Sequence, residues 1–416
     1  MGPSDLLADG EAALHWGESE RAFVALAAAA AAGVGPPELD RLAVAFAQAA
    51  RFLGRHAEVL AWIESQVAAG KGSRARLLRA RIAVCRHVDV PRVLDLGEEA
   101  LAAADAEGDQ ESYGAVLADV AFAAYREGAA RRANEHAERA ATRTFTDPVG
   151  AFFAARARFF AAAVRGDLEE GLRRCEECEA RAAALGRIGD AANEANNHAE
   201  IQLALGQPER ARAAAERGLC LSREAGHRCL EAFSSILACF ASAEAGDLDQ
   251  ALAELGHLPA GCSPIQAVDA AAAQSFWLLE RAAEGDAEHA GRVAEDAIGH
   301  AERVGVANRL TALCGQVARS LSRRGHGAVA RVWLERARLA ADRAEPTVEL
   351  VLALALAEVF PAGDPARGAA LASARARILR AAGRRADPHA YCTGVRLHRR
   401  LLELSGGVPS DLPDAG

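Results

Sequence analysis

Aromatic residues and lysine are scarce in this 416-residue chain. Phe, Trp and Tyr together make up 5% of the sequence, and Lys71 is its only lysine. Alanine supplies much of the 51% apolar fraction, and alanine is the strongest helix former. The residues that favour strands, Val and Ile above all, are sparse, and only 14 prolines occur. These shortages argue against a β-sheet protein and favour an all-α one.

The chain also lacks the sequence features of nucleic-acid-binding, secreted and membrane proteins. Its net charge is −9, and its arginines are scattered without a basic stripe interleaved with aromatics. The first eleven residues have no basic region and carry Asp5, Asp9 and Glu11, so no secretion signal is predicted. The longest apolar run, 23–34, is well short of the ~20 residues that a membrane span needs. We therefore expect a cytoplasmic protein without a nucleic-acid or membrane partner.

No motif for catalysis, cofactor binding or metal binding is evident. The sequence contains no phosphate-binding loop, dinucleotide fingerprint or zinc-protease motif. Cys175 and Cys178 form a CxxC pair, but structural zinc needs four ligands and no second pair occurs. Nine cysteines without framework spacing are typical of reduced thiols, and these two suit helix packing. We expect no catalytic residues, no metal and no cofactor.

The main positive signal is a glycine that recurs at a nearly constant interval. Neighbouring glycines of this series are 37 to 40 residues apart, except for one gap of twice 37. That gap predicts a degenerate repeat near Pro91, and hence ten repeats in all. The glycines are Gly17, Gly54, Gly128, Gly166, Gly206, Gly246, Gly285, Gly325 and Gly363.

Each recurring glycine has a physical interpretation. A glycine ends a helix at low cost because it adopts the left-handed conformation easily. A polar or acidic residue often follows, as in Gly246-Asp247, and can cap the next helix. A small residue lies five positions after the glycine, as in Gly206/Ala211, and lets two helices approach closely. Each repeat is therefore predicted to hold two helices of about 14–18 residues.

The repeats define the expected domain organisation. A single repeat array is predicted over residues 1–386. Asp387-Pro388 is a good N-cap and first-turn pair, so a C-terminal capping helix is predicted over 387–405. Gly406-Gly407 ends this helix, and 406–416 is predicted to be a flexible tail.

These helix pairs resemble the tetratricopeptide-repeat (TPR) family over nearly the whole chain. The turn glycine and the small residue five positions later match the family pattern, although the usual family period is 34. The longer period is similar to that of TPR arrays in bacterial signalling and regulatory proteins. The family's aromatic and Leu-Gly signatures are mostly absent here. The resemblance implies an all-α, right-handed superhelical solenoid of about ten TPR-like repeats plus the capping helix.

The resemblance also implies which residues face the concave groove, because the first helix of each TPR pair lines it. In the sixth repeat the family's contact positions carry Asn193, Asn196, Asn197 and Glu200. These four share one helix face, and the amide groups can both donate and accept hydrogen bonds with a peptide backbone. The alternative is an ordinary polar face exposed to solvent.

Neighbouring repeats place aromatic and charged residues on the same surface. We interpret them as walls of an apolar groove with a few polar groups, although packing between helices would also explain each ring. They are Phe122, Tyr125, Phe153, Phe160, Phe233, Phe240 and Phe276, with Arg156 and Asp119 adding charge.

Three functional hypotheses follow. The first is a non-catalytic scaffold or sensor that binds a protein or peptide partner in the concave groove. The second is a regulatory receptor that binds a small apolar ligand there. The third is a biosynthetic enzyme built on a helical-repeat shell, although no convincing cluster of titratable side chains supports it. Whether the chain forms a homodimer is left open.

Overall fold

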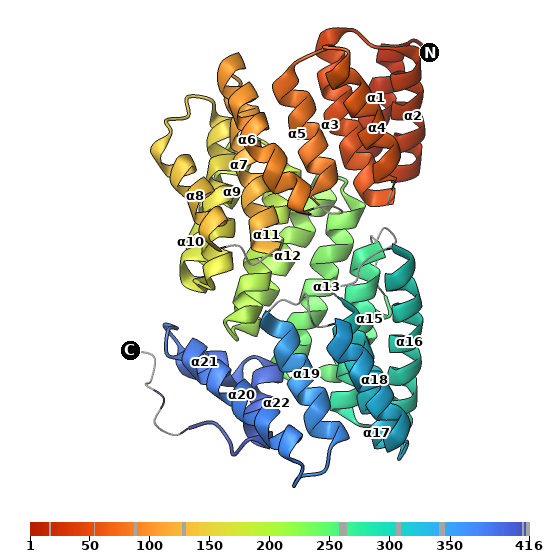
Figure 1. Ribbon diagram of the computed structural model, residues 1–416, viewed down its shortest axis with the longest axis vertical. Coiled ribbons are helices and arrows are strands. Elements are labelled where there is room, and N and C mark those ends of the chain that lie inside the picture. The colour runs from red at the N-terminus through yellow and green to blue at the C-terminus, as the bar shows by residue number, and fades with distance from the viewer. Residues whose placement is uncertain are drawn as a thin grey trace. The chain divides into compact units, whose positions relative to one another are not determined.

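The computed structural model describes residues 1–15, 18–53, 55–86, 90–126, 130–257, 264–304, 309–340, 346–409 and 412. Within these ranges the regular elements are all helices, and no strand occurs. In chain order (Figure 1) they are α1 (Pro3–His15), α2 (Ser19–Ala32), α3 (Pro36–Leu53), α4 (His56–Ala68), α5 (Arg74–Cys85), α6 (Val90–Glu107), α7 (Gln110–Arg126), α8 (Ala130–Thr142), α9 (Pro148–Arg165), α10 (Leu168–Ala184), α11 (Ile188–Ala204), α12 (Pro208–Glu224), α13 (Arg228–Ala245), α14 (Leu248–Leu255), α15 (Pro264–Arg281), α16 (Asp286–Val304), α17 (Leu310–Arg323), α18 (Gly327–Ala340), α19 (Pro346–Val359), α20 (Pro365–Ala382), α21 (Pro388–Thr393) and α22 (Arg396–Leu404).

The helices follow one another in pairs, as the glycine spacing predicted. The elements from α1 to α20 form ten consecutive pairs, and α5 and α6 are the degenerate repeat expected near Pro91. The chain is an all-α helical-repeat solenoid, so the predicted fold class is confirmed. It divides into two compact units, which are described separately below. Unit 1 comprises residues 1–195 and 220–230, and unit 2 comprises 196–219 and 231–416.

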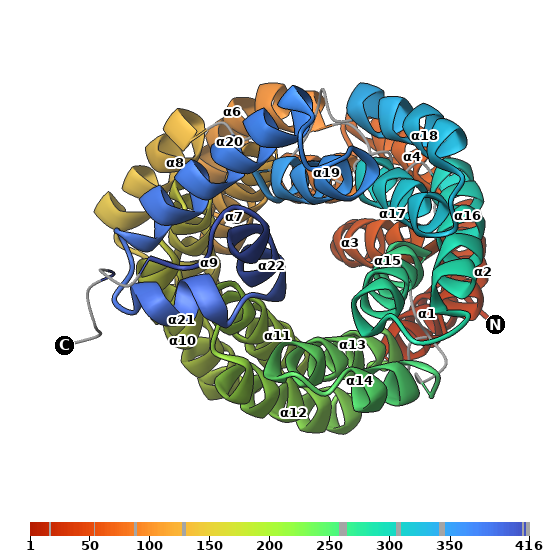
Figure 2. The ribbon, with the colours of Figure 1, turned by 90° about the horizontal axis from the view of Figure 1, so that it is seen from below.

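Within each unit the first helix of a pair lies inside the second. In unit 2, α13, α15, α17 and α19 lie on the inner side, and α14, α16, α18 and α20 lie outside them (Figure 2). In unit 1, α7 and α9 lie inside α8 and α10 in the same way. Within these pairs, side chains on the first helix can therefore line an inner surface.

The turns between paired helices use left-handed glycines, as predicted. Five of the series have positive φ angles, from 67° to 111°, which cost a glycine little. They are Gly166, Gly206, Gly246, Gly285 and Gly325, whereas Gly363 does not adopt such an angle and Gly17, Gly54 and Gly128 lie outside the described residues.

Aspartates are the N-cap residues of several helices. The side chains of Asp167 and Asp247, each directly after a turn glycine, accept hydrogen bonds from the backbone N–H groups of Glu170 and Gln250. Asp147 caps α9 by accepting from two backbone N–H groups. These carboxylates satisfy N–H groups that have no partner inside the helix and favour its positive end.

Small residues then let the paired helices pack closely. The residue five positions after the turn glycine is fully buried in four consecutive repeats, at Ala211, Ala251, Ala290 and Ala330. A larger side chain at these sites would push the two helices apart, because protein interiors are packed as densely as organic crystals and leave no spare room. The small residue predicted from the sequence is therefore the contact point within each pair.

The C-terminal segment differs from its prediction. Instead of one helix over 387–405 there are two short helices, α21 and α22, with Val395 in an extended conformation between them. The break places Gly394 against the α11–α12 turn in unit 2, where a Cβ atom on Gly394 would lie 2.1 Å from the carbonyl oxygen of Gly206. In the segment predicted to be a flexible tail, Val408 and Leu412 pack against the apolar cluster of α19, α20 and α22.

None of the helices that the structure describes is long and apolar enough to cross a membrane.

Candidate functional site

A hollow of about 670 Å³ in unit 1 is lined mainly by first helices of the repeats. Helices α1, α3, α5 and α7 contribute to it, together with the beginning of α11 and the turn between α12 and α13. Its volume is in the range of sites that bind small molecules or short peptide segments. Its lining residues are Glu11, Leu14, Asp40, Arg41, Val44, Ala45, Gln48, Arg76, Arg79, Glu111, Gly186, Arg187, Ile188, Gly189, Asp190, Glu224, Ala225 and His227.

Arginine–carboxylate pairs cross this hollow from one helix to another. Arg79 of α5 donates to Glu111 of α7 at 2.8 Å, and Arg41 of α3 donates to Glu11 of α1 at 3.1 Å. Because a guanidinium group has five donors, these pairs leave donors on each arginine for a further acceptor. The hollow therefore presents both charges, with each arginine held in place by a carboxylate.

The Phe153 ring lies close to two arginines of the lining, Arg79 and Arg187. The guanidinium carbons of Arg79 and Arg187 lie 5.3 and 5.4 Å from the centre of the Phe153 ring. Arg187 is also fixed by a 2.7 Å hydrogen bond to Asp190. A cation over an aromatic ring is attracted to it, so the ring orients both guanidinium groups without using their hydrogen-bond donors.

Asp40 is an unusual member of the lining because it is buried. Its side chain accepts a hydrogen bond from the backbone N–H of Ser73 at 3.0 Å, which ties α3 to the turn before α5. Burial raises the pKa of Asp40, although the Ser73 hydrogen bond and the nearby Arg76 oppose that shift. Asp40 thus holds the turn before α5 and lies 3.9 Å from Arg76 of that helix.

Arg79, Arg187 and Asp40 were not among the residues predicted from the sequence. The sequence marks these residues only weakly. Each is a charged residue that interrupts an apolar helix face or follows a turn glycine, as Arg187 follows Gly186. A single charged residue on such a face does not reveal which other repeats contribute to the same hollow. That information requires the packing of four successive repeats.

Arg156 was predicted to face the groove, and its guanidinium group lies within an ion-pair cluster of unit 1. It lies 2.9 Å from Glu194, which is fully buried, and 3.6 Å from Asp190. Burial alone would lower the pKa of Arg156, but Glu194 and Asp190 outweigh that effect and raise it. Arg156 joins α9 to the beginning of α11 and so supports the side of the hollow that carries Arg187 and Asp190.

The four polar residues of α11 do not share one environment. Asn193 and Asn197 are half-buried and Glu200 is exposed, whereas Asn196 is fully buried. The carbonyl oxygen of the Asn196 side chain accepts a hydrogen bond from Ser234 of α13 at 2.8 Å within unit 2. Asn196 was predicted to face the groove, but it packs between helices, because the small Ser234 and Gly218 leave room for its amide.

The predicted aromatic residues of unit 1 form a connected group. The ring of Phe160 lies 5.1 Å from that of Phe122 and 6.3 Å from that of Tyr125. Phe153 is nearly buried, whereas 40% of Tyr125 is exposed. Of these rings, only that of Tyr125 offers a large accessible surface to a partner.

The predicted aromatic residues of unit 2 pack between helices. Phe240 makes an edge-to-face contact with Trp277, with 5.3 Å between ring centres. Phe276 lies beneath the guanidinium group of Arg319, 5.3 Å from its central carbon, and Phe233 packs on the cluster around Leu237. All three are half-buried, so whether a ligand contacts them stays a prediction.

Cys175 and Cys178 are both fully buried on α10. The Cys175 thiol donates to the backbone oxygen of Glu194 at 3.0 Å. Burial raises the pKa of both thiols well above the usual value, so neither forms a thiolate near neutral pH. No group of three or more His, Cys, Asp or Glu residues that could hold a metal ion occurs in the described part of the chain.

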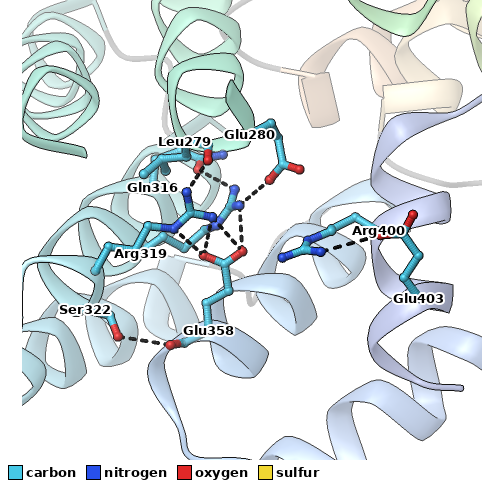
Figure 3. A network of polar contacts seen from close by, with 9 residues as sticks. Leu279, Glu280, Gln316, Arg319, Ser322, Glu358, Arg400 and Glu403 are labelled. Carbon is cyan, nitrogen blue, oxygen red and sulfur yellow. Dashed lines mark hydrogen bonds and ion pairs between the residues drawn. The ribbon is translucent and has the colours of Figure 1, made fainter. Parts of the chain in front are cut away.

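A buried ionic network lies in unit 2, at the ends of α15, α17 and α19. Arg319, which is 1% exposed, donates to Glu280 at 2.5 Å, to Glu358 at 2.9 Å and to Gln316 at 2.9 Å (Figure 3). Burial would raise the pKa of Glu358, but Arg319 and Arg323 lower it. The network neutralises a charge that would otherwise be costly to bury.

Comparison with known proteins supports the fold. No protein-family model and no curated protein sequence matches the chain. Among solved structures it is similar to a Rap protein complexed with competence and sporulation factor, with a TM-score of 0.54 and 12% identity over 79% of this chain and 97% of that one. It also matches the quorum sensor NprR from B. thuringiensis in its apo form, with a TM-score of 0.47 and 14% identity over 76% of this chain and 98% of that one. At these identities the likeness to the Rap protein shows a shared helical-repeat fold.

Proposed function

We propose that this protein is a cytoplasmic, non-catalytic scaffold or sensor that binds a peptide in the hollow of unit 1. One observation carries the proposal: the first helices of four successive repeats converge on a hollow lined by fixed arginines and carboxylates. The repeat period and turn glycines further support an array of the long-period TPR type that resembles those of bacterial regulatory proteins.

The chemistry of the lining suits a peptide. Arg79 and Arg187 are held by Phe153 and by one carboxylate each, and their remaining N–H groups can donate to peptide carbonyl or carboxylate groups. Glu111 and Asp190 can accept hydrogen bonds from peptide N–H groups. Because both charges alternate around the hollow, it favours a peptide over the small apolar ligand of the second hypothesis.

Two further points favour binding over catalysis. The side chains that line the hollow include no Ser, Thr, Cys or Lys, and the carboxylates of Glu11, Glu111 and Asp190 are engaged by arginines. The Rap protein of the comparison is complexed with competence and sporulation factor, and a fold shared with that protein is compatible with binding a partner. In unit 1, Asn193 of α11 and Tyr125 of α7 remain proposed peptide contacts, and Asn197 and Glu200 remain proposed partner contacts of unit 2.

A random synthetic peptide library tests the proposal. The purified full-length protein is incubated with the library, retained peptides are identified by mass spectrometry, and one is titrated by calorimetry. The Arg79→Gln/Arg187→Gln variant should bind it at least about tenfold more weakly, because two charge-assisted hydrogen bonds are lost. Arg173→Gln is the matched control, since the Arg173 side chain is 73% exposed on the outer helix α10.

Two outcomes would contradict the proposal. One is that no peptide is retained at micromolar protein concentrations. The other is that the double variant keeps full affinity while its thermal unfolding matches that of the wild type. The Asn193→Ala variant, titrated with the same peptide, decides whether the unit 1 part of α11 contributes contacts.

A further inference from the structure

A second hollow, of about 690 Å³, lies within unit 2. It is formed by the C-terminal ends of α15, α17 and α19 together with α20 and the inner helix α22. Arginines dominate its polar lining, although the chain as a whole carries a net charge of −9. They are Arg323, Arg367, Arg396, Arg399 and Arg400.

Four of these arginines use little of their hydrogen-bonding capacity on the protein. Arg367 and Arg399 each donate to one backbone carbonyl at 3.1 Å, those of Phe360 and Thr393, and Arg396 donates to that of Ala243. Carbonyl oxygens accept a hydrogen bond but do not neutralise the positive charge. Since a guanidinium group has five donors, each arginine retains most of them.

Arg400 is paired even more weakly. Its nearest carboxylate, that of the exposed Glu403, lies 3.5 Å away. The Nε atoms of Arg396 and Arg400 are buried and have no hydrogen-bond partner among the described residues. A buried donor without an acceptor costs free energy, so an oxygen supplied by a ligand would stabilise this arrangement.

The negative groups around the hollow are largely engaged already. Glu280 and Glu358 are bound by Arg319 (Figure 3), and Glu358 is also bound by Arg323. The partial negative charge at the end of α15 is met by Arg323, which donates to the carbonyl oxygen of Leu279. Among the lining carboxylates, Glu403 is the one that pairs with an α22 arginine, and Glu244, outside the lining, also faces Arg396 and Arg399.

We propose that this hollow binds a small ligand through an oxyanion group, a phosphate or a carboxylate, held by Arg399 and Arg400 of α22. The planar guanidinium group matches both oxyanions through paired N–H···O bonds. Figure 3 shows Arg400 extending from α22 toward the Arg319–Glu358 network, so the oxyanion is placed between α22 and the ends of the inner helices. Leu279, Ala357 and Leu404 provide an apolar wall for the rest of the ligand.

The crowding of positive charge agrees with this assignment. Burial lowers the pKa of Arg396 below its usual value, and the neighbouring Arg399 lowers it further, against the opposing effects of Glu244 and Glu280. A bound oxyanion relieves that repulsion.

The test uses the full-length protein with inorganic phosphate and with succinate, each against potassium chloride at equal ionic strength. Thermal unfolding and calorimetry should both show saturable binding that chloride does not reproduce. Tighter binding of phosphate than of succinate identifies a phosphorylated ligand, and the reverse order identifies a carboxylate. In the Arg399→Gln/Arg400→Gln variant, the dissociation constant of the preferred anion should rise at least about tenfold.

A second variant, expected to bind the anion more tightly, keeps the test decisive even if the arginine variant folds poorly. Glu403→Gln removes the carboxylate that competes for Arg400, so anion binding should become about two- to fivefold tighter. Arg338→Gln, at a side chain 58% exposed on α18, is the control and should bind as the wild type does. Equal stabilisation by chloride, or equal binding by the wild type and both α22 variants, would overturn the proposal. The peptide assay of unit 1 is independent of either result.

Discussion

Arg319 and Glu358 form an ion pair of 2.9 Å inside unit 2, and only 1% of the Arg319 surface is accessible. Glu280 lies 2.5 Å from the same guanidinium nitrogen. Three charges from three successive repeats are thus held together where the inner helices end. A charge buried this deeply stabilises a protein only while its partners are in place.

Arg319→Ala should therefore be strongly destabilising. It leaves Glu280 and Glu358 without their buried partner, which should cost about 3–5 kcal/mol of unfolding free energy. Denaturant unfolding followed by circular dichroism measures the loss. Arg338→Ala is the control, because its pair with Glu335 is exposed and should contribute less than about 1 kcal/mol. Similar midpoints for both variants would show that the network does not stabilise unit 2.

Replacing Asn196 by alanine should lower the free energy of unfolding much more than replacing Glu200. Asn196→Ala removes a buried hydrogen bond with Ser234 and should cost about 1–3 kcal/mol. Glu200→Ala changes an exposed side chain on the same helix and should stay within about 0.5 kcal/mol. Thermal unfolding of the two variants tests the difference. If the Asn196 variant melts like the wild type, its amide does not pack between helices in solution.

Two buried histidines should make the protein sensitive to mild acid. Burial is the main effect that lowers the pKa of His136 and His398, so the folded state favours the neutral ring. Below the ordinary histidine pKa of about 6.5 the unfolded chain binds more protons than the folded one, and stability falls as pH decreases toward the folded pKa. The loss is at most about 1.4 kcal/mol per pH unit for each histidine.

The measurement for this prediction is the melting temperature between pH 7.5 and 5.5. In a His398→Gln variant the slope below pH 6.5 should be shallower than in the wild type. An identical slope in both proteins would show that His398 is not the titrating group.

Gly206→Ala should be more harmful than Gly166→Ala. Both glycines have left-handed backbone angles, φ 73° and φ 67°, so alanine at either costs about 1–2 kcal/mol. Only at Gly206 would the new Cβ atom also meet the carbonyl oxygen of Ala390, at 2.1 Å, whereas nothing lies within 4 Å at Gly166. We expect an additional loss of about 1–3 kcal/mol at Gly206. Equal losses would mean that α21 does not rest against this turn in solution.

The cysteines should differ in reactivity. Burial raises the pKa of Cys175 and Cys178, so both should resist alkylation by iodoacetamide at pH 8, whereas the exposed Cys220 should react. Mass spectrometry of digested protein gives the labelled fraction at each site, and the same experiment in urea is the control. Rapid labelling of Cys175 in the folded protein would contradict its placement.

The repeat architecture could be predicted because its determinants are local. A turn glycine such as Gly246, the acidic cap Asp247 and the small residue Ala251 specify one helix pair within a few residues, and each takes the expected role. The break between α21 and α22 could not be predicted in this way. It depends on Gly394 lying against Gly206, and nothing near Asp387 in the sequence indicates that contact.

The candidate site was harder to predict from the sequence, because it also depends on contacts between distant segments. The family register identifies a helix face, but it does not show how deeply a neighbouring helix covers that face. Asn196 is covered because residues 218 and 234 are small, and both lie on other helices. Arg79 and Arg187 meet above Phe153 only when several repeats have stacked.

The contact between Gly206 and Gly394 has a consequence for how unit 2 folds. A repeat array can propagate from one helix pair to the next, because each pair contacts mainly its neighbours. The backbone contact at these two glycines joins segments far apart in sequence, so it cannot form until the last helices have been synthesised. The early helices of unit 2 must therefore keep one surface uncovered until α21 has been synthesised and has packed against them.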